Sequence, residues 1–122
     1  MHQNTFLQSP KLLDRYYADR RDPLVAFAGQ MTGVEGYMES AASGILAGIN
    51  CARALAGKEE LRLPVTCMTG ALSAYIAAPN QNFQPMGANF GILPPLDKHI
   101  RDKRERYAAL AERALTDFAE CI

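Results

Sequence analysis

Residues 27–57 read FAGQMTGVEGYMESAASGILAGINCARALAG, and this stretch decides the fold. It begins within a short apolar run, Leu24–Ala28, which a proline precedes and a glycine follows. Such a run predicts a buried strand, and because its residues do not alternate in polarity, we expect both faces of the strand to be covered. Gly29, Gly33 and Gly36 come next, and they predict a turn that leads into a long helix.

The long helix is predicted from the spacing of its apolar residues. Its start is expected between Thr32 and Tyr37, where Thr32 and Glu35 form the T-x-x-E pattern of a capping box. Gly57 is the expected C-terminal stop. The helical spacing is carried by Met38, Ala41, Ala42, Ile45, Ile49, Ala52 and Leu55.

The rest of the chain predicts an α+β fold, predominantly helical, with two long helices, one shorter helix and one or a few short strands. The shorter helix is expected at Cys67–Ala77 and the second long helix at Asp97–Glu120. Since one strand cannot form a sheet, either Met1–Leu7 and Phe90–Leu93 pair with Leu24–Ala28, or the sheet lies elsewhere. The second long helix carries an apolar stripe at Ile100, Tyr107, Leu110, Ala114 and Phe118.

Composition limits the classes of function. The 122 residues suit one small domain or part of a larger one, and the formal net charge of zero argues against binding of nucleic acid by bulk charge. Cys51, Cys67 and Cys121 form no metal-ligand spacing, and we expect reduced thiols in a cytoplasmic protein. His2 and His99 are far apart in sequence, and no apolar run is long enough to span a membrane.

The glycine-rich turn is the first candidate site. A strand, a glycine-rich turn and a helix together present backbone N–H groups to a ligand, because the first amides of a helix have no partner within it. The spacing of Gly29, Gly33 and Gly36 is not the GxGxxG fingerprint of dinucleotide sites. A tight structural turn explains these glycines equally well, and both interpretations remain open.

A basic segment, KHIRDKRER at residues 98–106, is the second candidate. One interpretation is a solvated helix face crossed by local ion pairs with Asp102 and Glu105. The other is a contact surface for the phosphates of a nucleic acid. The residues of this candidate nucleic-acid surface are Lys98, Arg101, Lys103 and Arg104.

Several stretches resemble one enzyme family. Residues 27–55, the N-terminal MHQNTFLQSPKLLD, and NFQPMGANFGILPPL followed by RDKRERYAALAERAL are similar to the carboxyl-terminal, flavin-binding segment of the folate- and FAD-dependent tRNA (uracil-5-)-methyltransferases, called TrmFO or Gid. The related GidA family, which modifies wobble uridines in tRNA, shares the A-G-Q…G-Y…A-A core and is the alternative.

The resemblance implies a set of functional expectations. Residues 1–122 would be a single C-terminal segment of an FAD-binding α/β (Rossmann-like) domain whose GxGxxG portion is absent, and Met1 would correspond to an internal methionine. The family uses FAD, 5,10-methylenetetrahydrofolate and NAD(P)H to methylate a T-loop uridine of tRNA. This chain alone would be inactive, and its partners would be the missing N-terminal portion or a second copy. A standalone non-catalytic interaction module is the alternative.

The resemblance also implies the cofactor-binding residues. The amides near Gly36–Met38 would face the pyrimidine edge of the flavin, where the helix dipole favours negative charge. The residues that match the family motif are Gly29, Gln30, Thr32, Gly33, Val34, Glu35, Gly36, Tyr37 and Met38.

Overall fold

The computed structural model describes residues 6–121 and has an α+β fold dominated by helices, which confirms the predicted class. Helices α2 and α4 have 19 residues each and α3 has 10. The elements are α1 (Ser9–Leu12), β1 (Ala18–Asp19), β2 (Asp22–Ala26), η1 (Gln30–Thr32), β3 (Val34–Glu35), α2 (Tyr37–Leu55), α3 (Met68–Ala77), β4 (Met86–Gly87), η2 (Phe90–Ile92) and α4 (Lys103–Cys121).

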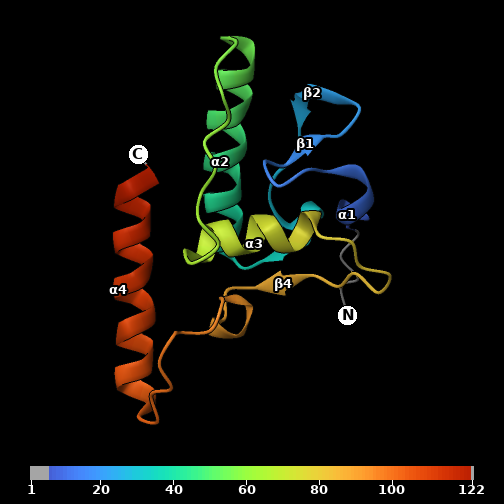
Figure 1. Ribbon diagram of the computed structural model, residues 1–122. Helices are drawn as coiled ribbons and strands as arrows, with labels where there is room; N and C mark the ends of the chain where they lie inside the picture. The colour runs from blue at the N-terminus through green and yellow to red at the C-terminus, as the bar shows by residue number, and fades with distance from the viewer. Residues whose placement is uncertain (1–5, 122) are drawn as a thin grey trace.

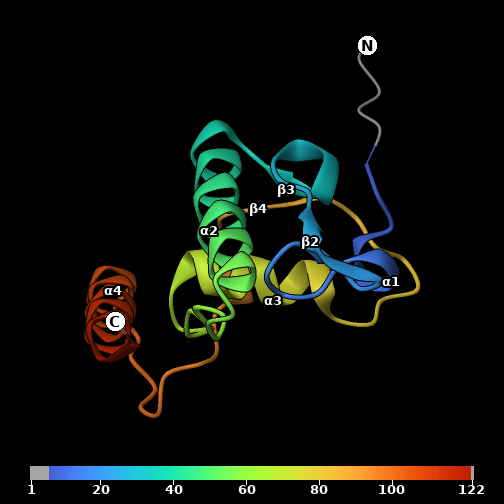
Figure 2. The same ribbon diagram turned by 90° about the horizontal axis from the view of Figure 1, so that it is seen from above.

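Helices α2 and α3 cross and carry the core between them. Figure 1 shows α3 passing beneath the lower end of α2, with the β1–β2 hairpin on one side and α4 on the other. Seen from above, α4 lies apart from the other helices (Figure 2). No helix within residues 6–121 is both long enough and apolar enough to cross a membrane. The buried core consists of Leu13, Tyr17, Val34, Leu46, Ala47, Leu63, Leu72, Ile76 and Phe83.

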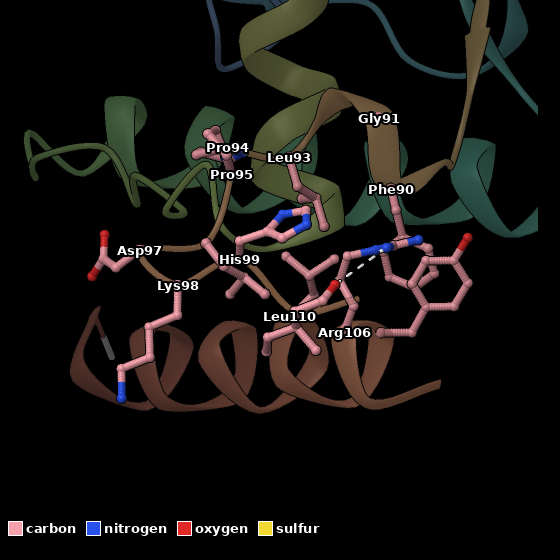
Figure 3. A pocket seen from close by; sticks show the side chains of 13 residues that line it. Phe90, Gly91, Leu93, Pro94, Pro95, Asp97, Lys98, His99, Arg106 and Leu110 are labelled. Carbon is pink, nitrogen blue, oxygen red and sulfur yellow. Dashed lines mark hydrogen bonds between the residues drawn. The ribbon is translucent and has the colours of Figure 1, made fainter. Parts of the chain in front are cut away.

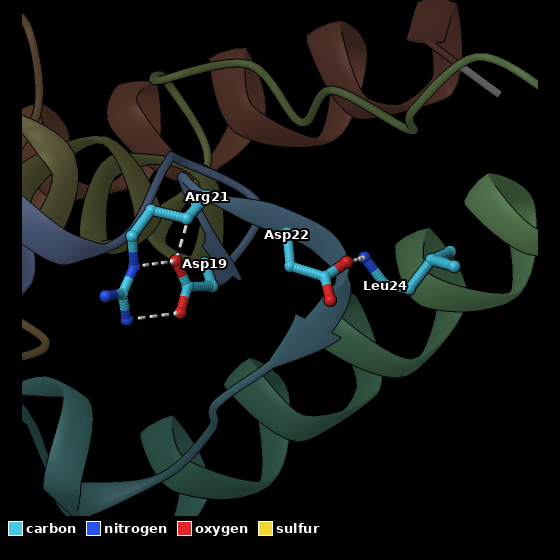
Figure 4. A network of polar contacts seen from close by, with 4 residues as sticks. All are labelled: Asp19, Arg21, Asp22 and Leu24. Atoms are coloured by element: carbon cyan, nitrogen blue, oxygen red, sulfur yellow. Dashed lines mark hydrogen bonds and ion pairs between the residues drawn. The ribbon is translucent and has the colours of Figure 1, made fainter.

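The predicted strand Leu24–Ala28 is observed as β2, shifted toward the N-terminus and paired antiparallel with β1. Figure 4 shows the hairpin turn, where the carboxylate of Asp19 accepts hydrogen bonds from the backbone and guanidinium of Arg21. The side-chain bond from Arg21 lowers the pKa of Asp19. Leu24 is 50% exposed, so the expectation that both faces are covered is wrong. Helix α2 packs against β2, but within the described residues the side chains of Leu24 and Val25 remain exposed.

The predicted partners of this strand are also wrong where the structure describes them. Phe90–Ile92 forms the 3-10 helix η2 instead of a strand, and Asn89 caps it by accepting a bond from the Gly91 amide at 2.9 Å. Of the predicted extended segment Met1–Leu7, residues 1–5 lie outside the described residues.

A second small sheet was not predicted. β3 and β4 pair in parallel, with Val34 opposite Met86 and Glu35 opposite Gly87. The amide of Met86 also donates to the carbonyl of Gly33 at 2.7 Å. This pairing brings the uncharged, amide-rich loop at residues 80–89 against the glycine-rich turn.

The ends of α2 follow the prediction in part. Gly57, at φ +72°, ends the helix in the Schellman arrangement, because its amide bonds the Ala54 carbonyl and the next amide bonds the Arg53 carbonyl. The capping box is wrong. Thr32 belongs to η1 and Glu35 to β3, while the residue before α2 is Gly36, whose position carries no side-chain cap.

The buried face of α2 is not the predicted stripe. The residues buried against the core are Ser43, Leu46, Ala47 and Asn50. The predicted stripe lies on the outside, where Met38 and Ile45 are both exposed.

Helix α4 starts six residues later than predicted and buries little. The preceding segment is irregular, and the guanidinium of Arg113 binds its start by donating to the carbonyls of Pro94 at 2.6 Å and Pro95 at 3.1 Å. Ile100 of the predicted stripe therefore lies outside the helix, and Leu110 is the buried residue of α4. The Thr66 hydroxyl donates to the Asp117 carboxylate at 2.5 Å and ties α4 to the α2–α3 connection.

Candidate functional site

The turn before α2 requires glycine at three positions. Gly29, Gly33 and Gly36 have φ values of +81°, +101° and +108°. Residues with a Cβ rarely adopt this left-handed region because the side chain clashes with the backbone. The turn therefore has a conformational reason for its glycines before any ligand is considered.

The surroundings of the three glycines differ. A Cβ on Gly33 would overlap the ring of buried Phe83, whose Cε2 lies 2.7 Å away, so this glycine is needed for packing. A Cβ on Gly36 would meet only the exposed end of Glu39, and one on Gly29 would meet nothing within 4 Å. The space beside Gly29 is therefore open, whereas the carboxylate of Glu39 lies beside Gly36.

Two buried serines hold the turn, and sequence reasoning missed both. The Ser9 hydroxyl donates to the Thr32 carbonyl at 2.5 Å, and the Ser43 hydroxyl accepts from the Gly29 amide at 2.8 Å. The Thr32 hydroxyl donates to the Gly29 carbonyl at 2.7 Å. These bonds satisfy the buried polar groups and fix the path of the turn. Isolated serines carry no pattern in a single sequence, so structure was needed to find them.

The N-terminus of α2 follows directly after the turn. The carboxylate of Glu39 folds toward it and accepts a bond from the amide of Ala88 at 3.0 Å. The Ala88 amide and the amide of Glu39 itself lower the pKa of this carboxyl group. The first amides of a helix, here those of Tyr37 and Met38, have no acceptor within the helix, and Gly36 at the N-cap has no side chain to bind them. An acceptor atom of a ligand could bind them.

The structure brings the nine predicted cofactor residues into one turn but gives them different roles. Thr32, Gly33 and Val34 are buried, so they can only position the backbone. Gly29 is half-buried. The residues exposed around the mouth of the turn are Gln30, Glu35, Gly36, Tyr37 and Met38.

A small apolar groove lies beside this turn. Its volume is about 220 Å³, and Met38 and Ala42 of α2 face Met68 and Leu72 of α3 across it. Tyr17 closes the groove, and burial raises the pKa of its phenol, which stays neutral. Small-molecule sites usually occupy roughly 300–1,000 Å³, so this groove suits one part of a ligand. It offers an apolar wall and backbone donors.

The basic candidate surface borders a larger cavity. Figure 3 shows this cavity, about 720 Å³, between the segment after η2 and the start of α4. The rings of Phe90 and Tyr107 stack there with centroids 4.2 Å apart. The charged groups of Lys103 and Arg106 each lie 5.5 Å from the Tyr107 ring centroid, within cation–π range. Aromatic and cationic groups together suit anionic, aromatic ligands such as nucleotides.

The four predicted nucleic-acid residues do not share one helix. Lys98 and Arg101 lie in the irregular segment before α4, and Lys103 and Arg104 lie in the first turn of α4. All four are exposed. Within residues 6–121 the ion pair between Arg21 and Asp19 stands alone, so the expected local ion pairs of a solvated face are not formed here.

Comparisons with known proteins agree with the resemblance. A family model described as "GIDA: Glucose inhibited division protein A" matches residues 1–59. The methylenetetrahydrofolate--tRNA-(uracil-5-)-methyltransferase TrmFO of Lactiplantibacillus plantarum is 58% identical over 118 residues, which cover 96% of this chain and 27% of that protein. The proteins of the same name from Pelotomaculum thermopropionicum and Staphylococcus aureus are 56% and 55% identical, over 94% and 98% of this chain.

The chain spans about a quarter of the length of the curated relatives it matches. The matched residues cover 94–98% of this chain. These matches support membership of the chain in the family of TrmFO and GIDA proteins.

Proposed function

We propose that this chain is the carboxyl-terminal segment of a cytoplasmic tRNA (uracil-5-)-methyltransferase that uses FAD and methylenetetrahydrofolate. The long alignments with proteins of that name carry the proposal. The segment contributes to the flavin site and is not catalytic by itself. The product of the whole enzyme is 5-methyluridine in the T-loop of tRNA.

The turn before α2 is the part of this chain that would hold FAD. The amides of Tyr37 and Met38 at the start of α2 fit the polar edge of a flat ring. The small groove between α2 and α3 offers an apolar wall next to those amides. Bound FAD would supply the chemistry that carries the one-carbon unit to uracil, with NAD(P)H as the reductant.

The fixed backbone of the turn explains how the residues of this chain would act. Buried Ser9, Thr32 and Ser43 hold the turn in place, so its amides need no reorganisation when a ligand binds. The carboxylate of Glu39 accepts a hydrogen bond from the backbone amide of Ala88. A groove of this size leaves most of a dinucleotide without contacts, and we expect the isolated chain to bind FAD weakly.

A chimaera tests the proposed function. The 118 matched residues of the L. plantarum relative are replaced by the corresponding residues of this chain, and 5-methyluridine is measured in tRNA that lacks it. We expect methylation by the chimaera and none by the isolated 122-residue chain. A folded chimaera that binds FAD and forms no 5-methyluridine would contradict the proposal.

The match of residues 1–59 to the GIDA model favours one alternative, a fragment of a flavoprotein that modifies wobble uridines. Nucleoside analysis of the same tRNA separates the two. Modification at the wobble position with the T-loop uridine unchanged would support the alternative.

The basic surface would contact tRNA phosphates. Arg101 and Arg104 are exposed, and no carboxylate of the described residues pairs with either. Removing a side chain that binds one phosphate should lower the salt dependence of binding by about one unit of slope. Arg101→Ala and Arg104→Ala chimaeras should therefore bind tRNA more weakly with a smaller salt slope, and an unchanged slope would remove these residues from the interface.

A further inference from the structure

The outer face of α2 is an exposed apolar stripe along the whole helix. We define the outer stripe as Met38, Ala41, Ile45, Ile49, Ala52 and Leu55. At about 100° per residue these positions fall within about 120° of the helix circumference, and at about 1.5 Å per residue they extend over about 26 Å. Met38, Ile45 and Leu55 are 81%, 65% and 71% exposed.

The core of this chain does not account for the outer stripe. Another face of α2, with Leu46, Ala47 and Asn50, already packs against the core. On that face the side-chain amide of Asn50 donates to the carbonyl of Leu61 at 3.1 Å and accepts a bond from the backbone amide of Leu61 at 2.5 Å. A helix of a soluble protein normally has one apolar stripe that faces the core, and a second stripe indicates a second packed neighbour.

Two glycines border the outer stripe and support close packing on that side. Gly44 and Gly48 lie one turn apart inside α2, and a Cβ on either would meet nothing within 4 Å. Glycine weakens the interior of a helix, and neither position needs glycine in this structure. A neighbouring backbone that approaches α2 closely would give both glycines a reason.

The small sheets point to the same kind of neighbour. β1–β2 and β3–β4 are two-stranded within the described residues, and β2 exposes Leu24 and Val25. A two-stranded sheet is marginal by itself, and a parallel pair is normally covered on both faces. The relatives are about four times as long as the part of them that this chain matches, so they carry ample polypeptide to cover these surfaces.

From these observations we propose that the outer stripe of α2 is a docking surface for the polypeptide that the longer relatives carry outside the matched quarter. This inference rests on the proposed function, because that function makes the longer polypeptide the natural partner. The partner surface would be apolar, would meet Ile45 near its centre, and would pass over Gly44 and Gly48 with its backbone.

Ile45→Glu tests the proposal in two settings. In the isolated chain Ile45 is exposed, and the melting temperature should change by less than about 2 °C. In the L. plantarum chimaera the same carboxylate would be buried, and the melting temperature should fall by at least about 5 °C. If this chimaera gives no soluble protein, Ile45→Ala replaces Ile45→Glu. A smaller fall in the melting temperature of the chimaera, with no fall in the isolated chain, would support the same conclusion.

Leu115→Glu on α4 is the matched control, because Leu115 is 72% exposed and lies outside the outer stripe. We expect the chimaera to tolerate it better than Ile45→Glu. Equal sensitivity to both changes, or a chimaera indifferent to Ile45→Glu, would overturn the proposal. A dimer of the isolated chain that Ile45→Glu dissociates, seen by sedimentation, with no effect on the chimaera, would assign the stripe to a second copy instead.

The stability readout separates this inference from the proposed function. If the chimaera makes 5-methyluridine and its melting temperature is unchanged by Ile45→Glu, the docking surface is refuted and the proposed function stands. If Ile45→Glu destabilises the chimaera and the chimaera modifies no uridine, the docking surface is supported and the proposed function is refuted.

Discussion

Gly33→Ala should destabilise the chain more than the same change at any other glycine of the turn. Gly33 has φ +101°, and an added methyl group would overlap the ring of Phe83. Phe83 is buried and belongs to the core, so its ring cannot move freely.

The expected loss has two parts. Forcing a residue with a Cβ into the left-handed region costs about 1–2 kcal/mol. Overpacking the core against the Phe83 ring costs about 1–3 kcal/mol more. The free energy of unfolding should therefore fall by about 2–5 kcal/mol in total.

Gly36→Ala is the matched control, because Gly36 has a similar φ of +108°. Its added methyl group would meet the carboxylate of Glu39, which ends a flexible, partly exposed side chain and can move by giving up its bond from the Ala88 amide. This variant should lose only the backbone part, about 1–2 kcal/mol.

Urea unfolding followed by far-UV circular dichroism measures both losses. With a slope of about 1–3 kcal/mol per molar urea, a difference of about 2 kcal/mol between the variants separates their midpoints by about 1 M. Phe83→Leu provides a background in which the ring is gone, and Gly33→Ala should cost less there. Equal losses for the two alanine variants, or an equal cost of Gly33→Ala in both backgrounds, would refute the packing argument.

Three further results are expected. The bond from the Ala88 amide lowers the pKa of Glu39 in the folded state, so the ionised carboxylate contributes fully to stability above its ordinary pKa of 4.5, and this contribution is lost as the pH falls through the lowered value. Glu39→Gln should therefore weaken the loss of stability at acid pH, measured as the free energy of unfolding against pH. An unchanged loss would count against the contact. Thr66→Val should lower the free energy of unfolding by about 1.5–3 kcal/mol, because it removes a hydrogen bond to the charged Asp117, and Asp117→Asn should be milder in urea unfolding. Gly36→Val in the chimaera should reduce the ratio of bound FAD to folded protein, measured by absorbance, and a normal ratio would remove Gly36 from the proposed flavin site.

Local patterns predicted the elements that depend on local interactions. The helix at Cys67–Ala77 and the end of α2 at Gly57 follow from nearby residues, and both were predicted correctly. The pairing of β3 with β4 joins residues about 50 positions apart, and the loop around Met86 carries no strand signal, so sequence reasoning missed it. The late start of α4 follows an irregular segment whose Pro94 and Pro95 carbonyls accept bonds from Arg113, and periodicity cannot report such contacts.

The position of the glycine-rich turn was predictable from the sequence, whereas the contacts that fix it were not. The glycines of residues 29–36 mark the turn because a positive φ excludes most other residues. Which glycine packs inward depends on Phe83, about 50 residues away in sequence. The hydroxyl groups of Ser9 and Ser43 fix the turn through bonds that leave no pattern in the chain.

The stripe on α2 shows what helical periodicity measures. The spacing of Ile45, Ile49 and Ala52 predicts a face that is removed from water, and the structure leaves that face open. Periodicity responds to selection on the complete folded protein, whereas exposure here is measured on a chain about a quarter as long as its relatives. If the docking surface is as proposed, the periodic pattern is correct for the longer protein, and the residues it marks are the ones that the remaining polypeptide buries. The face with Leu46 and Ala47 then packs against this chain and the outer stripe packs against the remaining polypeptide. A helix packed on two sides is what we expect in the interior of a larger domain.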